Sequence, residues 1–389
     1  MTVVYYTSTF FLDLSLDIIN VLKKKVDLHI FIEVTSSSKN STVAEIHDFP
    51  TGKLLATPEE VLSDKSLKVL APFFEGAISM HFIIHEHRTG FSWSTLQASL
   101  AVWKYIKPFK PEIIHFEGYT LRTIGMLPFL FSVKKVFLVI HDPVPHTGES
   151  SWKISMPNFL FFKLPFKKYF IFYSDFARKL FTNNYRSVGG EKLLVKMRPY
   201  SYFKKSPEKS TDEKEHILFF GRISPYKGID VLLKAMPAVF EEFANEKLVI
   251  AGKSTNSYIL NDDLPEKYKD NVQIINRYIT NDELIDLISR AKFVVCPYLD
   301  ATQSGVLMTA FALDTPAITT NVGSFPEFID NNFNGLLVSP ACPALLSEKI
   351  ALALKHNYYK QLQHNVVLSN TLSSWEDSLK AVLTEYTSL

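Results

Sequence analysis

The sequence of 389 residues has little cysteine, no excess of charge of either sign and no long apolar run. Its two cysteines, Cys296 and Cys342, provide neither a disulfide framework nor metal-ligand spacing, and they fit a reducing compartment. The 42 basic and 40 acidic side chains nearly cancel, which argues against a partner made of nucleic acid. A local basic site for an anionic ligand is still compatible with this balance.

Targeting and membrane signals are scarce as well. The amino terminus enters a β-branched and aromatic run at residues 3–6 without a basic segment before it, so we expect no signal peptide. No stretch reaches ~18 uninterrupted apolar residues, so we expect no membrane-spanning helix. With 47% hydrophobic residues the chain can bury large cores, and its length predicts two domains. These features predict a cytoplasmic protein.

Phenylalanine, by contrast, is abundant, with 31 residues, several of them in the segment 159–170. Basic and aromatic residues alternate there, which is compatible with peripheral contact with an anionic face of a membrane. The alternative is a packed helix followed by a strand at 169–172. The apolar run at the end of the segment favours the packed helix and strand.

Short apolar runs alternate with helix-length segments, which predicts βαβ units and parallel sheets. A charged, turn-rich stretch at 204–215 interrupts this alternation and indicates a domain boundary. Residues 34–91 show no clear pattern. The strands expected from the sequence are 3–6, 28–33, 113–116, 136–140, 216–220, 248–251, 272–275, 293–298, 317–320 and 336–338. The helices expected are 12–24, 93–104, 121–130, 229–244 and one that a capping box starts at 280–283.

The most informative motif follows the strand expected at 216–220. Gly221 ends the apolar run, and two cations five residues apart, Arg222 and Lys227, precede an amphipathic helix. A glycine at a strand end allows a ligand to approach the backbone closely, and two fixed cations suit a diphosphate. The alternative is a pair of solvated charges on a surface loop.

A second motif lies about 75 residues downstream, where a polar loop follows the strand expected at 293–298. A helix then opens at Ser304 and Gly305. The first amides of a helix have no acceptor within it and carry partial positive charge, so they can bind a phosphate. The alternative is an ordinary junction with Ser304 as the N-cap. In a doubly wound sheet both motifs lie at the carboxyl ends of the strands, where ligands bind.

Taken together, these segments resemble the retaining glycosyltransferases of family 4, which have the GT-B fold. The resemblance covers most of residues 216–340 and rests on several motifs in the same order. The amino-terminal half resembles the family weakly, mainly at 112–118 and 139–143. The motifs of the second half are 220–228, 249–252, 312–318, 321–329 and 334–338.

The resemblance implies an α/β protein of two Rossmann-like, doubly wound domains that face each other across a cleft. It implies an acceptor domain at 1–200, a nucleotide-sugar domain at 201–365 and a carboxyl-terminal helix at 366–389 that crosses back to the first domain. The donor would be a nucleotide-diphosphate sugar and the acceptor a saccharide or a lipid-linked molecule. Such an enzyme would use no cofactor and no metal, and it could lie peripherally at the inner face of the membrane.

The same resemblance implies roles for residues of the second half. Arg222 and Lys227 correspond to the pair that binds the diphosphate and stabilises the leaving group. Tyr278 and Ile279 follow a strand end where the family contacts the nucleobase through backbone groups. The residues expected to bind the donor are Gly221, Tyr278, Ile279, Gln303, Ser304, Gly305, Val306 and Thr309.

One departure from the family concerns two glutamates, eight residues apart, that contact the donor sugar and the ribose. Ala301 and Thr309 occupy these positions here, with Asp300 and Gln303 close to the first. A neutral Thr309 would hold a ribose less strongly than a carboxylate. Two alternatives to a transferase therefore stay open: a protein that binds nucleotide sugars without turnover, and a nucleotide-sugar epimerase of the same architecture.

In the first half, His141 and Asp142 directly follow an expected strand, and Glu117 follows another. The resemblance implies that His141 contacts the donor, and that Glu117 and Asp142 touch the donor or the acceptor. The alternatives are a structural histidine and two surface carboxylates. The histidines at 81, 85 and 87 indicate a solvated loop rather than a metal site, because Glu86 and Arg88 lie among them.

Overall fold

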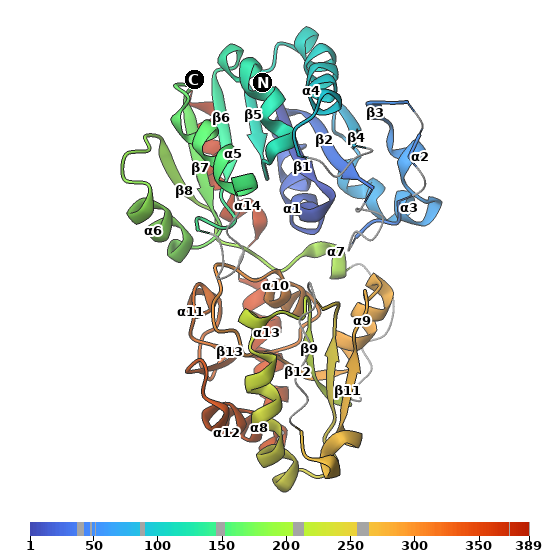
Figure 1. Ribbon diagram of the computed structural model, residues 1–389, viewed down its shortest axis with the longest axis vertical. Helices are drawn as coiled ribbons and strands as arrows, with labels where there is room; N and C mark the ends of the chain where they lie inside the picture. Colours follow the sequence, from blue (N-terminus) through green and yellow to red (C-terminus); the bar gives the residue numbers. More distant parts are fainter. Residues whose placement is uncertain are drawn as a thin grey trace. The chain divides into compact units, whose positions relative to one another are not determined.

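The computed structural model describes residues 1–36, 43–46, 49–50, 52–85, 90–144, 152–204, 214–254, 264–372 and 374–388. The chain forms two compact units, each built around its own parallel sheet. Unit 1 comprises 1–173, 178–196 and 375–389, and unit 2 comprises 174–177 and 197–374. Figure 1 shows helices packed on the sheet of each unit.

The sheet of unit 1 has eight strands in the order β3-β4-β2-β1-β5-β6-β7-β8. Every neighbouring pair is parallel except β3 and β4. The central strands are buried almost end to end, as expected for a parallel sheet with both faces covered. The strands are β1 (Thr2–Ser8), β2 (Asp27–Thr35), β3 (Leu55–Ala56), β4 (Ser79–His85), β5 (Ile113–Phe116), β6 (Lys135–Val139), β7 (Lys168–Phe172) and β8 (Glu191–Leu194).

Helices cover both faces of this sheet. His115 and Phe116 are neighbours on β5, so their side chains point to opposite faces. His115 contacts Tyr386 of α15, whereas Phe116 packs against Phe161 of α5. The helices of unit 1 are α1 (Leu12–Leu22), α2 (Pro58–Val61), α3 (Asp64–Phe74), α4 (Trp93–Ile106), α5 (Trp152–Lys163), α6 (Asp175–Asn184), α14 (Trp375–Ser378) and α15 (Lys380–Thr387), with 3-10 turns η1 (Thr9–Phe11), η2 (Lys107–Phe109) and η3 (Leu121–Ser132).

The carboxyl terminus is fixed to unit 1 by a buried lysine. Lys135 of β6 donates hydrogen bonds to the carbonyl oxygens of Glu385 and Ser388 at the end of α15. The last carbonyls of a helix lack partners within the helix and carry partial negative charge, so an ammonium group stabilises them. This contact explains why 375–389 belongs to unit 1.

The sheet of unit 2 has six parallel strands in the order β11-β10-β9-β12-β13-β14. The central strand β9 is fully buried, and α8 and α12 pack against each other on the sheet (Figure 1). The strands are β9 (His216–Phe220), β10 (Leu248–Ala251), β11 (Val272–Ile275), β12 (Ala291–Cys296), β13 (Ala317–Thr320) and β14 (Gly335–Val338). The helices are α7 (Ser201–Lys204), α8 (Ile229–Glu242), α9 (Asn281–Ser289), α10 (Gly305–Ala312), α11 (Phe325–Phe328), α12 (Pro343–Leu354) and α13 (Tyr358–Thr371), with η4 (Pro225–Lys227), η5 (Glu266–Asn271) and η6 (Lys355–Asn357).

The structure differs from the sequence predictions in several segments. Residues 34–91, left open above, contain β3, α2, α3 and β4. The helix expected at 121–130 is a 3-10 helix, η3, with Pro128 inside it. Helix α13 continues to Thr371 in unit 2, so the return to unit 1 begins at Trp375 rather than at 366. Most of the charged stretch at 204–215 lies outside the described residues.

The aromatic segment 159–170 belongs mainly to the core. Phe161, Phe162, Phe166 and Phe170 are buried, and only Phe159 among its phenylalanines is exposed. The packed-helix interpretation therefore describes this segment, and its aromatic residues do not form a surface patch. Within the described parts of the chain, no helix combines the length and apolarity that crossing a membrane requires.

Candidate functional site

The carboxyl end of β9 brings three predicted groups together. Gly221 has a φ of 110°, and its amide donates to the carbonyl of Ala251 at 3.0 Å. A methyl group placed on Gly221 would lie 3.2 Å from Val306 Cγ2 and 3.3 Å from Lys227 Nζ. The loop after β9, the ammonium of Lys227 and the start of α10 therefore meet at one point. A side chain at position 221 would be strained and would crowd this point.

Lys227 is a buried cation at this point. Its Nζ donates to the hydroxyl of Tyr298 at 2.7 Å and lies 4.4 Å from the centre of that ring. Burial, with a smaller contribution from Arg222, lowers the pKa of Lys227 to about 8. The short η4 turn leads into Gly228, where a Cβ would lie 2.1 Å from the carbonyl oxygen of Pro297. Close backbone packing thus fixes the position of the lysine.

Tyr298 is a residue that the sequence analysis missed. Its ring packs edge-on against Phe325, with centroids 5.3 Å apart, and its carbonyl accepts from Thr320 Oγ1 at 2.6 Å. Burial raises the pKa of Tyr298 well above its usual value, so its hydroxyl stays neutral and can accept from Lys227. A tyrosine directly after a buried strand looks like core, and its contact with a lysine 71 residues away leaves no signal in the sequence.

Arg222 differs from Lys227 in its surroundings. Its side chain is exposed, and its Nη2 lies 3.5 Å from the hydroxyl of Tyr226. Its guanidinium, unlike the ammonium of Lys227, lies at the surface of the protein. The two cations are therefore a fixed, partly desolvated ammonium and an adaptable guanidinium.

The start of α10 has the geometry of a capped helix. Ser304 is the N-cap, and its Oγ accepts from the amide of Leu307 at 3.4 Å. A Cβ on Gly305 would lie 3.3 Å from the hydroxyl of Tyr200, so a tyrosine hydroxyl borders the helix start. Thr309 donates its hydroxyl hydrogen to the carbonyl of Gly305 at 2.9 Å. Its oxygen therefore has only acceptor capacity left for a ligand.

The positions expected to face a nucleobase, Tyr278 and Ile279, lie in the loop between β11 and α9. Strand β11 is two places from β9, and Gly252 at the end of β10 donates to the carbonyl of Ile275 at 3.0 Å. The carbonyl of Tyr278 accepts from Arg277 Nη1 at 3.1 Å. Tyr278 and Ile279 therefore lie beyond the carboxyl ends of the strands, as Gly221 does.

Glu117 follows β5 in unit 1 and is completely buried. Its carboxylate accepts hydrogen bonds from the hydroxyls of Tyr5 at 2.7 Å and Tyr173 at 2.6 Å. His141 Nε2 lies 3.2 Å from Glu117 Oε1 and 2.6 Å from the Glu117 carbonyl oxygen. Because Glu117 has no exposed surface, the expectation that it touches donor or acceptor directly is corrected here. Its contacts are those of a residue that positions His141.

His141 is held from two sides. Its ring stacks on Phe11, with centroids 4.0 Å apart and planes 6° from parallel. Burial lowers the pKa of His141, but the hydrogen bond and the charge of Glu117 outweigh burial and raise it. Nearby on α1, burial raises the pKa of Asp13 to about 6. Asp142, the other predicted carboxylate, is exposed beside this histidine.

A second buried carboxylate in unit 1, Glu33 of β2, was not predicted. Tyr6 donates to its Oε1 at 2.8 Å, and Arg122 donates to its Oε2 through Nε and Nη2, each at 3.2 Å. His85 Nε2 lies 3.4 Å from Oε1. Although burial opposes it, these partners lower the pKa of Glu33. Glu33 lies in the segment that gave a clear strand signal, but its partners come from distant elements.

The predicted solvated loop of histidines is wrong for two of its three members. His81 and His85 lie in strand β4, and the position at 87 is outside the described residues. Across the described portion of the sequence, no three histidine, cysteine or carboxylate side chains are grouped to hold a metal ion.

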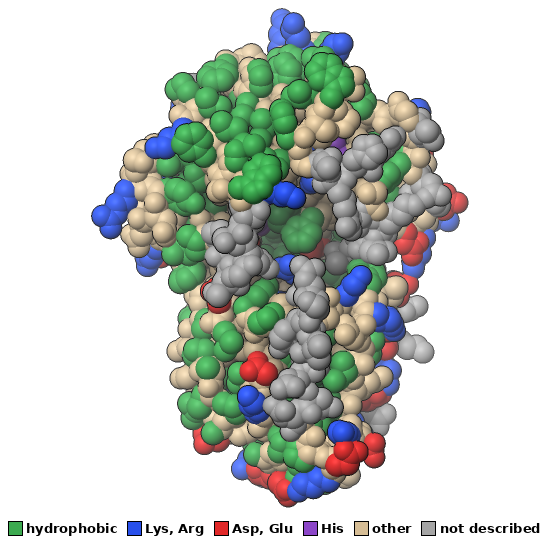
Figure 2. Space-filling model, viewed as in Figure 1, with side chains coloured by type: hydrophobic (Ala, Val, Ile, Leu, Met, Phe, Trp, Pro, Cys, Tyr) green, Lys and Arg blue, Asp and Glu red, His purple; other side chains and the backbone are tan. Residues whose placement is uncertain are grey.

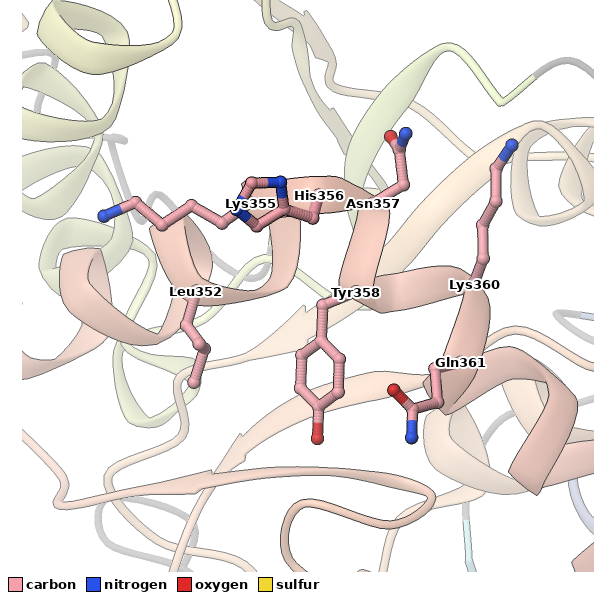
Figure 3. Close-up of a pocket in the computed structure, with 7 residues that line it drawn as sticks. All are labelled: Leu352, Lys355, His356, Asn357, Tyr358, Lys360 and Gln361. Carbon is pink, nitrogen blue, oxygen red and sulfur yellow. The ribbon is translucent and has the colours of Figure 1, made fainter.

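A hollow of about 670 Å³ lies at the junction of α12 and α13, well separated in sequence from the predicted site residues. Figure 3 shows that the side chains of Lys355 and Lys360 point away from each other. Lys355 pairs with Glu242 at 3.0 Å. The cations do not converge, so this hollow lacks the charge arrangement of an anion site. It is lined by Leu352, Lys355, His356, Asn357, Tyr358, Lys360 and Gln361.

Comparison with solved structures defines the class of fold. A glycosyltransferase from Rickettsia africae superposes with a TM-score of 0.66 at 14% identity, covering 100% of this chain and 98% of that one. An Anabaena protein solved in complex with UDP and glucose gives a TM-score of 0.67 at 13% identity, covering 100% of both chains. At such low identity this likeness shows the fold alone. The protein has the GT-B fold, with two Rossmann-like units in one chain.

Sequence comparison then identifies the second unit. Residues 202–367 match the family described as glycosyl transferases group 1. An uncharacterized glycosyltransferase of Methanocaldococcus jannaschii is 29% identical over 177 residues, 45% of this chain and 45% of the relative. The D-inositol 3-phosphate glycosyltransferase of Corynebacterium glutamicum is 27% identical over 148 residues, 36% of this chain and 34% of the relative. The match thus spans less than half the length of these relatives. Residues 202–367 lie within unit 2, so the similarity to glycosyl transferases group 1 belongs to that unit.

Proposed function

We propose that this protein is a retaining glycosyltransferase that moves a hexosyl group from a nucleotide-diphosphate sugar to a saccharide or lipid-linked acceptor, without a metal or other cofactor. Unit 2 binds the donor, and unit 1 supplies the acceptor side of the reaction. The observation that carries the proposal is the meeting of Gly221, Lys227 and Val306 within about one side chain's length of each other. The group 1 match over the same residues supports it.

The chemistry follows from the charges that develop during transfer. Breaking the bond between the sugar and the diphosphate leaves negative charge on the departing phosphate. Lys227, Arg222 and the amides at the start of α10 supply donors to that charge, and the donors are already in place before the reaction. The buried position of Lys227 strengthens its interaction, because the surrounding protein screens charge less than water does.

The other contacts with the nucleotide sugar are assigned from the positions of the residues. The loop at Tyr278 and Ile279 receives the base, and Gln303 and Ser304 lie next to the sugar–phosphate end. Thr309, with its remaining acceptor lone pairs, receives a hydrogen bond from a ribose hydroxyl. In unit 1, His141 and Asp142 are assigned to contact with the substrates by the resemblance, and Glu117 keeps the His141 ring in position and raises its pKa.

A second candidate, a protein that binds nucleotide sugars without turnover, is favoured by one observation. Ala301 and Thr309 stand where related enzymes carry carboxylates, Ala301 is buried, and the hydrogen of Thr309 is used within its helix. The site then has cations for a diphosphate but no carboxylate at either of these two positions. An epimerase of the same architecture has no observation of this kind in its favour.

Two measurements test the proposal. Thermal melting of the full chain with UDP-, GDP- and ADP-linked sugars is expected to show stabilisation by at least one of them, since a ligand that binds the folded state raises its melting temperature. Slow release of nucleoside diphosphate from the stabilising donor is then expected of a transferase. Stabilisation without release would favour the binding protein, and no stabilisation by any donor would contradict both candidates.

A further inference from the structure

Unit 1 has a surface on which aromatic side chains point into solvent. We call it the α4–η3–α5 face, because those three elements form it together with Phe91 before α4 and Phe109 after it. It comprises the exposed residues Phe91, Trp93, Leu100, Phe109, Phe131, Trp152 and Phe159. In Figure 2 hydrophobic side chains dominate the upper part of the view, where these elements lie. Single exposed apolar residues are ordinary, but a large cluster of them marks an interaction surface.

Helix α4 shows how unusual this face is. Its buried positions are small or polar in the first part of the helix, at Thr95, Ala98 and Ser99, and apolar further on, at Val102 and Ile106. One reason is close packing on η3, where a Cβ on Gly125 would lie 2.5 Å from Ser99 Oγ. Its outward positions carry Trp93, which is 74% exposed, and Leu100 one heptad later. Between Trp93 and Leu100 the large apolar side chains therefore lie outside and the small or polar ones inside, the reverse of an ordinary surface helix.

The three elements form one continuous face. Trp103 of α4 stacks on Phe129 of η3, with centroids 4.9 Å apart. Phe131 at the end of η3 meets Phe166, just after α5, with centroids 6.0 Å apart. These two contacts connect α4 with η3 and η3 with the end of α5, so the three elements are neighbours.

The charge of this face has one sign. The segments 93–110, 121–135 and 152–168 contain no aspartate or glutamate. Their exposed lysines include Lys104 near the end of α4, Lys107 and Lys110 after it, and Lys163 at the end of α5. The surface of unit 2 is mixed, with acidic and basic side chains side by side at the lower end of the view in Figure 2.

We propose that the α4–η3–α5 face docks on a lipid bilayer that contains anionic lipid. Tryptophan and phenylalanine insert into the interfacial region, while lysines reach the charged headgroups with their ammonium ends. Charge decides against a second copy of this chain, because two such faces would bring lysines together without acidic partners. Protein interfaces are also depleted in lysine. The docking rests on this face alone and does not depend on the proposed sugar transfer.

Vesicle binding by the purified full chain tests the proposal. The protein should sediment with phosphatidylcholine vesicles that contain phosphatidylglycerol, less so as salt is raised, and weakly with phosphatidylcholine alone. The combined substitutions Trp93→Ser, Phe131→Ser and Phe159→Ser should lower the binding constant about tenfold or more. Replacing Lys104 or Lys107 by glutamine should lower it about fivefold each.

Control substitutions lie in unit 2. Leu372→Ser removes a leucine that is 80% exposed, and Lys360→Gln removes an exposed lysine; neither should change vesicle binding. Unaltered melting curves show that the variants are folded. Sedimentation of the triple variant equal to that of the original chain would overturn the proposal. So would failure of the original chain to bind anionic vesicles, or a dimer in analytical ultracentrifugation that the triple substitution dissolves.

The two proposals can fail separately. The triple variant should keep its thermal response to nucleotide sugars, and Lys227→Ala should keep its binding to vesicles. Loss of vesicle binding on Lys227→Ala would show that the measured association does not come from the α4–η3–α5 face.

Discussion

The groups at the carboxyl ends of the strands have opposite charge in the two sheets. In unit 2 the carboxyl ends of the strands are followed by a glycine, two cations and the amides of a helix start. In unit 1 the edge contains two buried carboxylates, Glu33 and Glu117, each surrounded by tyrosine hydroxyls and histidine. One architecture thus supports a candidate anion site in one unit and internally satisfied carboxylates in the other.

The difference shows how charge is used at each edge. The buried carboxylates of unit 1 already have their hydrogen-bond partners, so they organise the side chains around them and are not open to a ligand. The buried ammonium of unit 2 has a neutral tyrosine as its partner and a lowered pKa, which is the condition of a cation that lacks an anion. A bound diphosphate would supply the charge that this site lacks.

The largest expected effect comes from removing the buried cation of unit 2. With the donor that stabilises the protein best, Lys227→Ala should lower the rate of nucleoside diphosphate release about 10- to 100-fold, from the loss of one charge-assisted contact of about 1.5–3 kcal/mol. Lys267→Ala is the matched control, since Lys267 also lies over a tyrosine ring, at 4.5 Å, but is exposed. Equal loss in both variants, or none in Lys227→Ala, would contradict the assignment.

A large effect on stability is expected from the buried carboxylate of unit 1. Glu117→Ala leaves the hydroxyls of Tyr5 and Tyr173 without their acceptor, which should cost about 1–3 kcal/mol of unfolding free energy. Denaturant unfolding measures it. The control Glu112→Gln removes an exposed pair with Lys134 and should change stability by less than about 1 kcal/mol.

Glu117→Gln separates charge from size at the same position. The raised pKa of His141 stabilises the folded state fully below the unfolded histidine's pKa, and this contribution is lost as pH rises through the folded value. Without the Glu117 charge the pKa of His141 should fall. The stability difference between the original chain and the variant should therefore be larger at about pH 6 than at about pH 8. An unchanged His141 titration in NMR spectra of the variant would contradict the positioning role.

A pH effect on nucleotide binding is the next test. The pKa of Lys227 is about 8 in the free protein, and a bound diphosphate favours the charged form. Affinity should therefore fall as pH rises above 8, by up to about tenfold per pH unit. Calorimetric titration of the nucleoside diphosphate measures it, at pH values where its terminal phosphate, with a pKa of about 6, is already ionised. The slope should disappear in Lys227→Met, and a slope that persists there would assign the titration to another group.

The smallest effect should come from the partner of the lysine. Tyr298→Phe removes the hydroxyl that accepts from Lys227 Nζ but keeps the ring packed against Phe325. The loss of one hydrogen bond of about 0.5–1.5 kcal/mol should weaken nucleotide binding about two- to tenfold. Tyr359→Phe, at another buried tyrosine of unit 2, should leave binding unchanged. A Tyr298→Phe variant with unaltered affinity would show that Lys227 is positioned by backbone packing alone.

Local patterns in the sequence predicted much of the fold. The strands of unit 2 and the turn at Gly221 follow from apolar runs that end at turn residues, and the start of α9 follows from its N-cap, Thr280, whose hydroxyl oxygen accepts from the amide of Glu283. These signals are short-range, so they can be read one segment at a time. Residues 34–91 failed this approach because β3 and α2 are only a few residues long.

The candidate site was predictable only in part. The cations and the helix start are motifs within single segments, whereas Tyr298 and Glu33 acquire their roles from residues far along the chain. Glu117 was recognised as a candidate but given the wrong surroundings, since its position after a strand says nothing about burial. The aromatic segment 159–170 likewise gave no sign of which phenylalanines face solvent.

The sequence by itself determined many of the strands and helices, where a candidate phosphate-binding motif lies, and that the segments 93–110, 121–135 and 152–168 contain lysine but no aspartate or glutamate. The tertiary structure alone decided which charges are buried, which hydroxyls meet them and which aromatic residues remain outside. The physical reason is that periodicity and turn chemistry act between near neighbours, while burial and pKa depend on groups that only folding brings together.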